Sequence, residues 1–204
     1  LGLLDALGIE TAHVVGLSMG GMIAFQMAVD RPERVRSLVI INSGPALVAR
    51  TFNERLRVWQ RLALARLFKP ARTAQFLGPR LFPKPEQEQL RQQFTAQWAE
   101  NDPQAYRAAM RALVGWSVLD RVRGIACPTL VISGDRDYTP AEAKRAYTAR
   151  LPRAELVIFE DSGHATPIDQ PDRFNARVLE FLAASSSPLP RERIRTRQRR
   201  AIDE

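Results

Sequence analysis

Short apolar runs alternate with longer stretches of helical periodicity over much of this chain. The apolar runs are rich in β-branched residues and end at turn-forming or polar residues, which predicts buried strands at 12–15, 35–41, 128–133 and 154–159. Apolar residues at helical spacing predict helices at 1–7, 19–30, 141–149 and 171–184. Strands that alternate with helices are typical of an α/β fold.

The segment from Gly44 to about Trp116 has a different pattern. Apolar residues recur in it at helical spacing, prolines interrupt it, and it has no strand-like run, so it is expected to be helical throughout. Its aromatic residues are expected mostly to form its own core, although any of them could line an acyl pocket: Phe52, Trp59, Phe68, Phe76, Phe82, Phe94, Trp98, Tyr106 and Trp116.

The composition is that of an ordinary globular protein, with 204 residues, 45% of them hydrophobic and 25% charged. The apolar runs are all shorter than the roughly 20 residues that a membrane helix requires. A single cysteine, Cys127, excludes a disulfide within the chain and favours a reducing compartment, so we expect a cytoplasmic protein. Two histidines and one cysteine form no ligand cluster, and no metal or organic cofactor is expected.

The net charge of +8 comes mainly from arginine, and six arginines lie in the tail that begins at Ser185. The sequence Ser-Ser-Ser-Pro-Leu-Pro followed by arginines predicts a disordered basic tail over 185–204. Because the tail lacks the interleaved aromatics of a base-stacking surface, we expect a solvated extension that binds neither nucleic acid nor membrane.

A Gly-x-Ser-x-Gly motif, Gly16-Leu17-Ser18-Met19-Gly20, joins the first predicted strand to the first long helix. In that setting the motif indicates a nucleophile elbow, in which a strained turn exposes the serine hydroxyl at the start of a helix. We expect a Cβ at Gly16 or Gly20 to collide with the neighbouring strand or helix. The alternative is that Ser18 merely caps the helix, which is a very common role for serine.

An acid and a histidine follow in the order that a serine hydrolase needs. Asp135 and Asp137 come directly after the strand at 128–133, and His164 lies in a loop after the strand at 154–159. The carboxyl ends of strands are where open α/β sheets place their functional residues. The other histidine, His13, precedes the elbow and is expected to have a packing role.

These motifs, with Arg31-Pro32-Glu33-Arg34-Val35 and Ser162-Gly163-His164, resemble the α/β-hydrolase superfamily from residue 1 to about 184, and in particular its serine-nucleophile branch of esterases and enol-lactonases. The resemblance implies that Ser18 is the nucleophile, His164 the general base and Asp137 the acid that orients it, with Asp135 as the rival acid. It also implies that the backbone N–H of Met19 is one oxyanion-hole donor.

The resemblance further implies an α/β-hydrolase fold with a mostly parallel sheet, here built from strands 5–8 only, and an inserted helical cap. The expected parts are a core with the elbow at 1–44, a cap at 45–117, a second core segment at 118–184 and the tail at 185–204. The chain is expected to be a C-terminal portion of a longer protein, because members normally have four strands before the elbow.

The implied function is hydrolysis of a small-molecule ester, lactone or related acyl substrate through an acyl-enzyme. The alternative is an inactive remnant that needs the missing first strands, one of whose loops carries the second oxyanion donor in this superfamily. The oligomeric state stays open.

Overall fold

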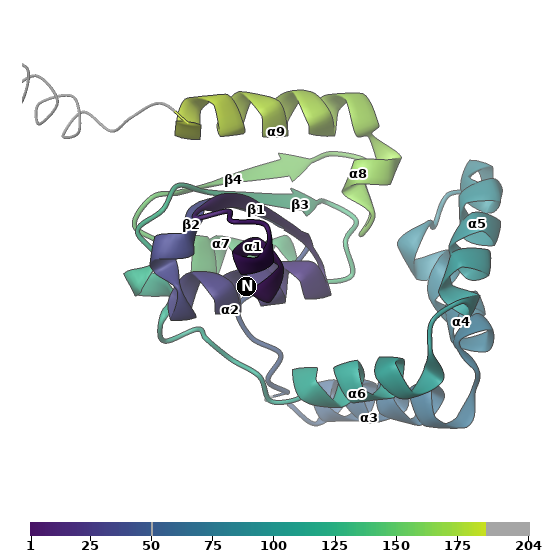
Figure 1. The fold of residues 1–204 in the computed structure, drawn as a ribbon. Coiled ribbons are helices and arrows are strands. Elements are labelled where there is room, and N and C mark those ends of the chain that lie inside the picture. Colours follow the sequence, from purple (N-terminus) through teal and green to yellow (C-terminus); the bar gives the residue numbers. More distant parts are fainter. Residues whose placement is uncertain (50, 187–204) are drawn as a thin grey trace, which may run out of the picture.

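A computed structural model describes residues 1–49 and 51–186, apart from the side chains of Glu54, Arg57 and Arg61. Its centre is a four-stranded sheet in which all neighbouring strands are parallel (Figure 1). The spatial order follows the chain order: β1 (Ala12–Leu17), β2 (Val35–Ile41), β3 (Thr129–Gly134) and β4 (Ala154–Phe159). The predicted parallel α/β sheet is thus confirmed. Because the strands are parallel, their carboxyl ends lie at the same edge.

Helices cover both faces of this sheet (Figure 1). On one face α2 (Met19–Asp30) and α7 (Ala141–Thr148) pack with Leu38 and Ile40 of β2. On the other face α9 (Pro171–Ser186) packs with Val39 and Ile41. Consecutive strand residues point to opposite faces, and both faces are buried, which is why β2 reads as a continuous apolar run.

Four longer helices lie between β2 and β3, where the sequence predicts a helical segment. They are α3 (Phe52–Leu67), α4 (Pro70–Leu81), α5 (Glu88–Ala99) and α6 (Pro103–Leu113). Their largest aromatic cluster joins Phe82, Phe94, Trp98 and Tyr106, with neighbouring ring centroids 4.9–6.0 Å apart. Phe52 and Trp59, by contrast, are 79% and 66% exposed. The expectation of an internal core therefore holds for part of the aromatic set.

The two ends of this helical segment meet in a short antiparallel neck. Ala46 and Ser117 form an isolated β-bridge. The backbone N–H of Leu47 donates to the carbonyl of Trp116 at 2.8 Å, and that of Val118 donates to the carbonyl of Pro45 at 2.8 Å. The chain therefore leaves the sheet and returns to it at one place.

The remaining elements are short: α1 (Gly2–Ala6), α8 (Thr166–Asp169) and the 3₁₀ turns Pro32–Arg34, Pro85–Gln87 and Val122–Gly124. Helix α9 includes Ser185 and Ser186, so the helix extends two residues into the predicted tail, and residues 187–204 lie outside the described part of the chain. Within the described residues, the helices are all too short or too polar to span a bilayer.

Candidate active site

Ser18 occupies a strained turn between β1 and α2. Its φ of 55° lies in the left-handed region of backbone conformation, which residues other than glycine rarely adopt. The strain is held by hydrogen bonds on both sides: the N–H of Ser18 donates to the carbonyl of Ile41 at 2.9 Å, and its carbonyl accepts from the Ser43 hydroxyl at 2.6 Å. The turn places Ser18 at the carboxyl edge of the sheet and at the start of α2, of which Met19 is the first residue.

Two glycines make this turn possible. A Cβ at Gly16 would lie 2.4 Å from the backbone of Gly20, and one at Gly21 would lie 2.6 Å from Cβ of Ser43. A Cβ at Gly20 would meet nothing within 4 Å. The expected collision at Gly20 is therefore wrong, because that residue faces open space. The close approach falls on Gly21, which the five-residue motif does not include.

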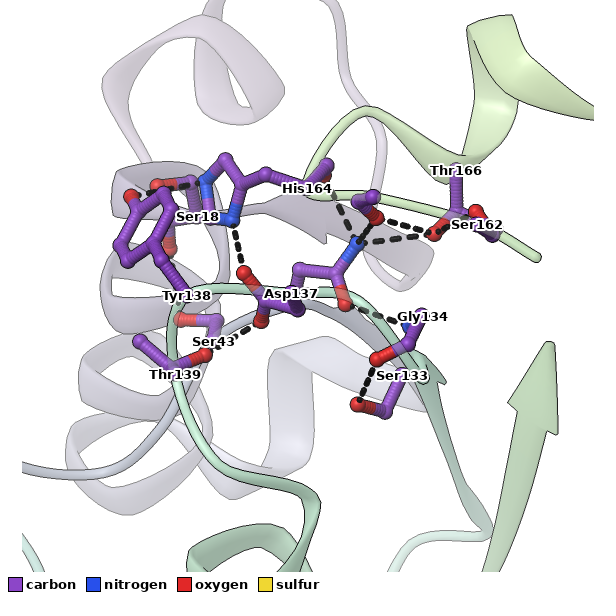
Figure 2. Close-up of polar contacts among 12 residues, drawn as sticks. Ser18, Ser43, Ser133, Gly134, Asp137, Tyr138, Thr139, Ser162, His164 and Thr166 are labelled. Atoms are coloured by element: carbon purple, nitrogen blue, oxygen red, sulfur yellow. Dashed lines mark hydrogen bonds and ion pairs between the residues drawn. The ribbon is translucent and has the colours of Figure 1, made fainter. Parts of the chain in front are cut away.

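Asp137 and His164 meet at the same edge of the sheet, from the loops after β3 and β4 (Figure 2). Asp137 Oδ1 lies 2.7 Å from His164 Nδ1, and their side chains are 0% and 6% exposed. Asp135 points elsewhere and accepts a hydrogen bond from the N–H of Ser162 at 3.0 Å. Of the two candidate acids, Asp137 is the one in contact with the histidine.

The second oxygen of Asp137 also has partners. Oδ2 accepts hydrogen bonds from Lys144 Nζ at 2.5 Å and from the Thr139 hydroxyl. Burial by itself raises the pKa of Asp137, but the hydrogen bond and charge of His164 and the hydrogen bonds from Lys144 and the Thr139 hydroxyl outweigh it, so that the pKa lies below its usual value. The carboxylate is thus ionised at neutral pH.

The other imidazole nitrogen, Nε2, lies 3.0 Å from the hydroxyl of Tyr138. The Tyr138 ring lies against the imidazole, with centroids 4.2 Å apart and the planes 30° from parallel. Figure 2 draws Ser18 on the same side of the imidazole as this hydroxyl and Asp137 on the Nδ1 side. Among the described residues, Tyr138 is the hydrogen-bond partner of Nε2.

Asn42, directly after β2, connects the acid loop to the histidine loop through its side chain. It is 1% exposed and has a φ of 45°. Its side-chain oxygen accepts from the N–H of Gly134 at 2.9 Å. Its amide nitrogen donates to the carbonyl of His164 at 2.7 Å and to the Thr166 hydroxyl at 2.8 Å. These bonds fix the backbone that carries His164.

Three further titratable residues have partners outside the contact between Asp137 and His164. Asp169 accepts a hydrogen bond from the N–H of Gly163, and Asp161 forms ion pairs with Lys84 and Arg136. His13 bonds to the Ser37 hydroxyl on β2 at 2.6 Å. In the described part of the chain, no group of three or more His, Cys, Asp or Glu side chains is arranged to hold a metal ion.

A cavity of about 530 Å³ lies between the segment 79–85 and the acid loop. Its lining includes the cationic residues Arg80, Lys84 and Arg136, and also Tyr138. Tyr138 therefore lines the cavity and also contacts the imidazole of His164.

The sequence reasoning did not find Asn42, Tyr138 or Lys144. Lys144 and Tyr147 are three residues apart and share one face of α7. The position of a lysine on the same helix face as an aromatic residue could have indicated that Lys144 is buried. Tyr138 and Asn42 carried no such signal, because their partners come from distant segments.

Comparison with known proteins agrees with this architecture. Residues 1–177 match the family described as the alpha/beta hydrolase family. The chain is 30% identical over 205 residues to 2-hydroxy-6-oxo-6-phenylhexa-2,4-dienoate hydrolase of Burkholderia cepacia, covering 89% of this chain and 66% of that protein. It is 28% identical over 175 residues to 3-oxoadipate enol-lactonase 1 of Acinetobacter baylyi, covering 85% and 65%. The chain thus spans just under two thirds of the length of these two relatives.

The fold agrees with solved structures as well. The enol-lactonase from Burkholderia xenovorans LB400 superimposes with a TM-score of 0.81 at 24% identity, over 89% of this chain and 69% of that one. The family match over residues 1–177 includes the elbow, the acid loop and the histidine loop. With its parallel sheet and its family match over most of its length, this chain belongs to the alpha/beta hydrolase family.

Proposed function

We propose that this protein is a serine hydrolase of small ester, lactone or related acyl compounds, with Ser18, His164 and Asp137 as its catalytic triad. One observation carries the proposal: the buried contact between Asp137 Oδ1 and His164 Nδ1 lies at the same sheet edge as the strained turn of Ser18. A histidine whose Nδ1–H is held by a carboxylate presents Nε2 as the base.

In the proposed reaction, Nε2 of His164 takes the proton of the Ser18 hydroxyl while the serine oxygen attacks the substrate carbonyl. Asp137 stabilises the imidazolium that forms. The imidazolium then protonates the leaving group, and the acyl group stays on Ser18. Water, deprotonated by the same nitrogen, attacks the acyl carbon; the bond to Ser18 breaks, the acid leaves, and the imidazolium returns the proton to the Ser18 oxygen. The free N–H of Met19 at the start of α2 is proposed as one donor to the oxyanion.

The proposed substrate class is small and acyl-containing. Support comes from the relatives, whose names describe a dienoate hydrolase and an enol-lactonase. We assign substrate selection to the helices between Phe52 and Leu113, as a cap, because residues of α4 and of the segment after it line the cavity beside Tyr138.

A fluorophosphonate probe tests the proposal, because it reacts covalently with an activated serine. The full chain is labelled, digested and mapped by mass spectrometry. We expect the label on Ser18, no label on Ser18→Ala, and normal labelling of the control Ser186→Ala at the far end of α9. A label on another serine, or none on the folded chain, contradicts the proposal; the second result supports an inactive remnant.

A further inference from the structure

Lys144 is a buried lysine beside the proposed triad. Its side chain is 2% exposed, and the side chain of Asp137 that it contacts is 0% exposed. Nζ donates to Asp137 Oδ2 at 2.5 Å, to the Thr139 carbonyl at 2.7 Å and to the Thr139 hydroxyl at 2.7 Å. A lysine is almost never fully buried unless its charge is paired. This lysine has three acceptors, and one of them belongs to its carboxylate partner.

The contacts divide the two oxygens of Asp137 between two functions. Oδ1 is left to the imidazole of His164, while Oδ2 is held by Lys144 and Thr139. A carboxylate held on one oxygen cannot rotate without breaking those bonds. Lys144 therefore fixes the direction in which Oδ1 points.

The charge of Lys144 has a separate effect. Burial lowers the pKa of Lys144, and the hydrogen bond and charge of Asp137 oppose that effect. With Lys144 protonated, Asp137 ionised and His164 neutral, the buried group of these three residues has no net charge; without the lysine its charge would be −1. A buried group of net charge −1 takes up a proton more readily than a neutral one, whether the proton goes to the carboxylate or to the imidazole. Lys144 thus keeps the pair in its working protonation state at lower pH.

The other titratable groups around this cluster do not replace that charge. Tyr147, on α7 with Lys144, donates to the Ser43 carbonyl at 3.0 Å, and burial and the Asp137 charge raise its pKa, so it stays neutral. Tyr138 presents a hydroxyl to Nε2. Asp169, from α8, is bonded to the N–H of Gly163. Lys144 is therefore the cation in contact with Asp137 among the described residues.

We propose that Lys144 is a positioning residue of the triad, which holds Asp137 ionised with Oδ1 turned to His164 and so extends activity to lower pH. This inference rests on the proposed function. It goes beyond that function in assigning the acidic limit of the reaction to a residue outside the three triad positions.

The test compares the pH dependence of kcat/KM for p-nitrophenyl acetate in the full chain and two variants. Lys144→Met removes the charge and the bonds. Thr139→Val removes a neutral bond to the same oxygen of Asp137 and one of the three acceptors of Lys144, but it leaves the charge of Lys144 in place. We expect the acidic limb of the profile to move to higher pH by about one unit or more in Lys144→Met. In Thr139→Val we expect a lower rate with the limb in its original place.

A second readout does not need turnover. The chain has two histidines, so the imidazole C–H signals in an NMR titration are assigned with His13→Gln. In a Ser18→Ala background, Lys144→Met should move the midpoint of the His164 signal to higher pH, and Thr139→Val should not. Should Lys144→Met fail to fold, Lys144→Gln takes its place, because it is neutral and keeps a donor.

The two readouts separate the two proposals. An unchanged midpoint and an unchanged acidic limb in a folded neutral variant overturn the role of Lys144. Equal shifts in Thr139→Val and Lys144→Met also overturn it, because they would mean that loss of geometry alone is sufficient. Absence of esterase activity in the wild-type chain would instead contradict the proposed function, while the NMR titration would still decide the role of Lys144.

Discussion

The hydroxyl of Tyr138 and Nε2 of His164 lie 3.0 Å apart, with the tyrosine ring against the imidazole. In the proposed mechanism this nitrogen accepts the proton of Ser18. Tyr138 and Ser18 therefore compete for one hydrogen-bonding position. The tyrosine is 58% exposed and lines the cavity beside the segment 79–85.

Replacing Tyr138 by phenylalanine keeps the ring and removes the competing hydroxyl. Because a neutral hydrogen bond is worth about 0.5–1.5 kcal/mol, we expect kcat/KM for p-nitrophenyl acetate to stay level or to rise by up to about tenfold. Steady-state kinetics of Tyr138→Phe beside the wild type measures this. A tenfold fall would show that the hydroxyl takes part in the reaction.

The two neighbouring aspartates give a matched pair. Asp137→Asn removes the charge that orients His164, and we expect kcat to fall by up to about 10⁴-fold. Asp135→Asn changes an acceptor for the Ser162 N–H at the surface of the loop, and its cost should be small. Both variants are assayed for ester hydrolysis after circular dichroism has verified folding. The reverse order of costs would mean that Asp135 is the working acid.

The glycines of the elbow give a second matched pair. Gly21→Ala would bring its Cβ within 2.6 Å of Ser43, and we expect a loss of about 1–3 kcal/mol in unfolding free energy. Gly20→Ala points into open space, and we expect it to be neutral or slightly stabilising, because alanine favours a helix more than glycine does. Urea unfolding measures both. Equal destabilisation would contradict the distinction between the two sites.

Asn42 should be important for stability as well as for activity. Asn42→Ala leaves the buried N–H of Gly134 and the Thr166 hydroxyl without this partner and retains a positive φ, so we expect a loss of roughly 3 kcal/mol. Asn101→Ala, which removes a single exposed bond to the carbonyl of Trp98, is the control and should cost little. A loss below about 1 kcal/mol for Asn42→Ala would show that the two loops are held by other contacts.

Local patterns in the sequence were sufficient to predict the sheet and its neighbouring helices. The strand at 35–41 has the predicted bounds, because it is buried on both faces and so appears as one unbroken apolar run. The strand that begins at Ala12 continues to Leu17, two residues beyond the predicted end, because its hydrogen bonding with β2 runs into the elbow.

The contacts within the site could not be predicted in the same way. The motif identifies Ser18, but the need for glycine at position 21 depends on Ser43, which is 22 residues away in sequence and adjacent in the fold. Likewise, Asn42 reaches His164 across 122 positions. These residues meet because the carboxyl ends of neighbouring strands lie side by side in the folded sheet. The pattern of a single sequence does not show which residues become neighbours there.

The neck formed by Ala46 and Ser117 joins the two ends of the helical segment at one place beside the sheet. The segment that leaves the sheet and the segment that returns to it are hydrogen-bonded to each other at this neck. The paired strands and the loops that carry Ser18, Asp137 and His164 lie on the sheet side of the neck. If the proposed function is right, we expect substitutions in the helical segment to change the substrate while the proposed triad stays the same.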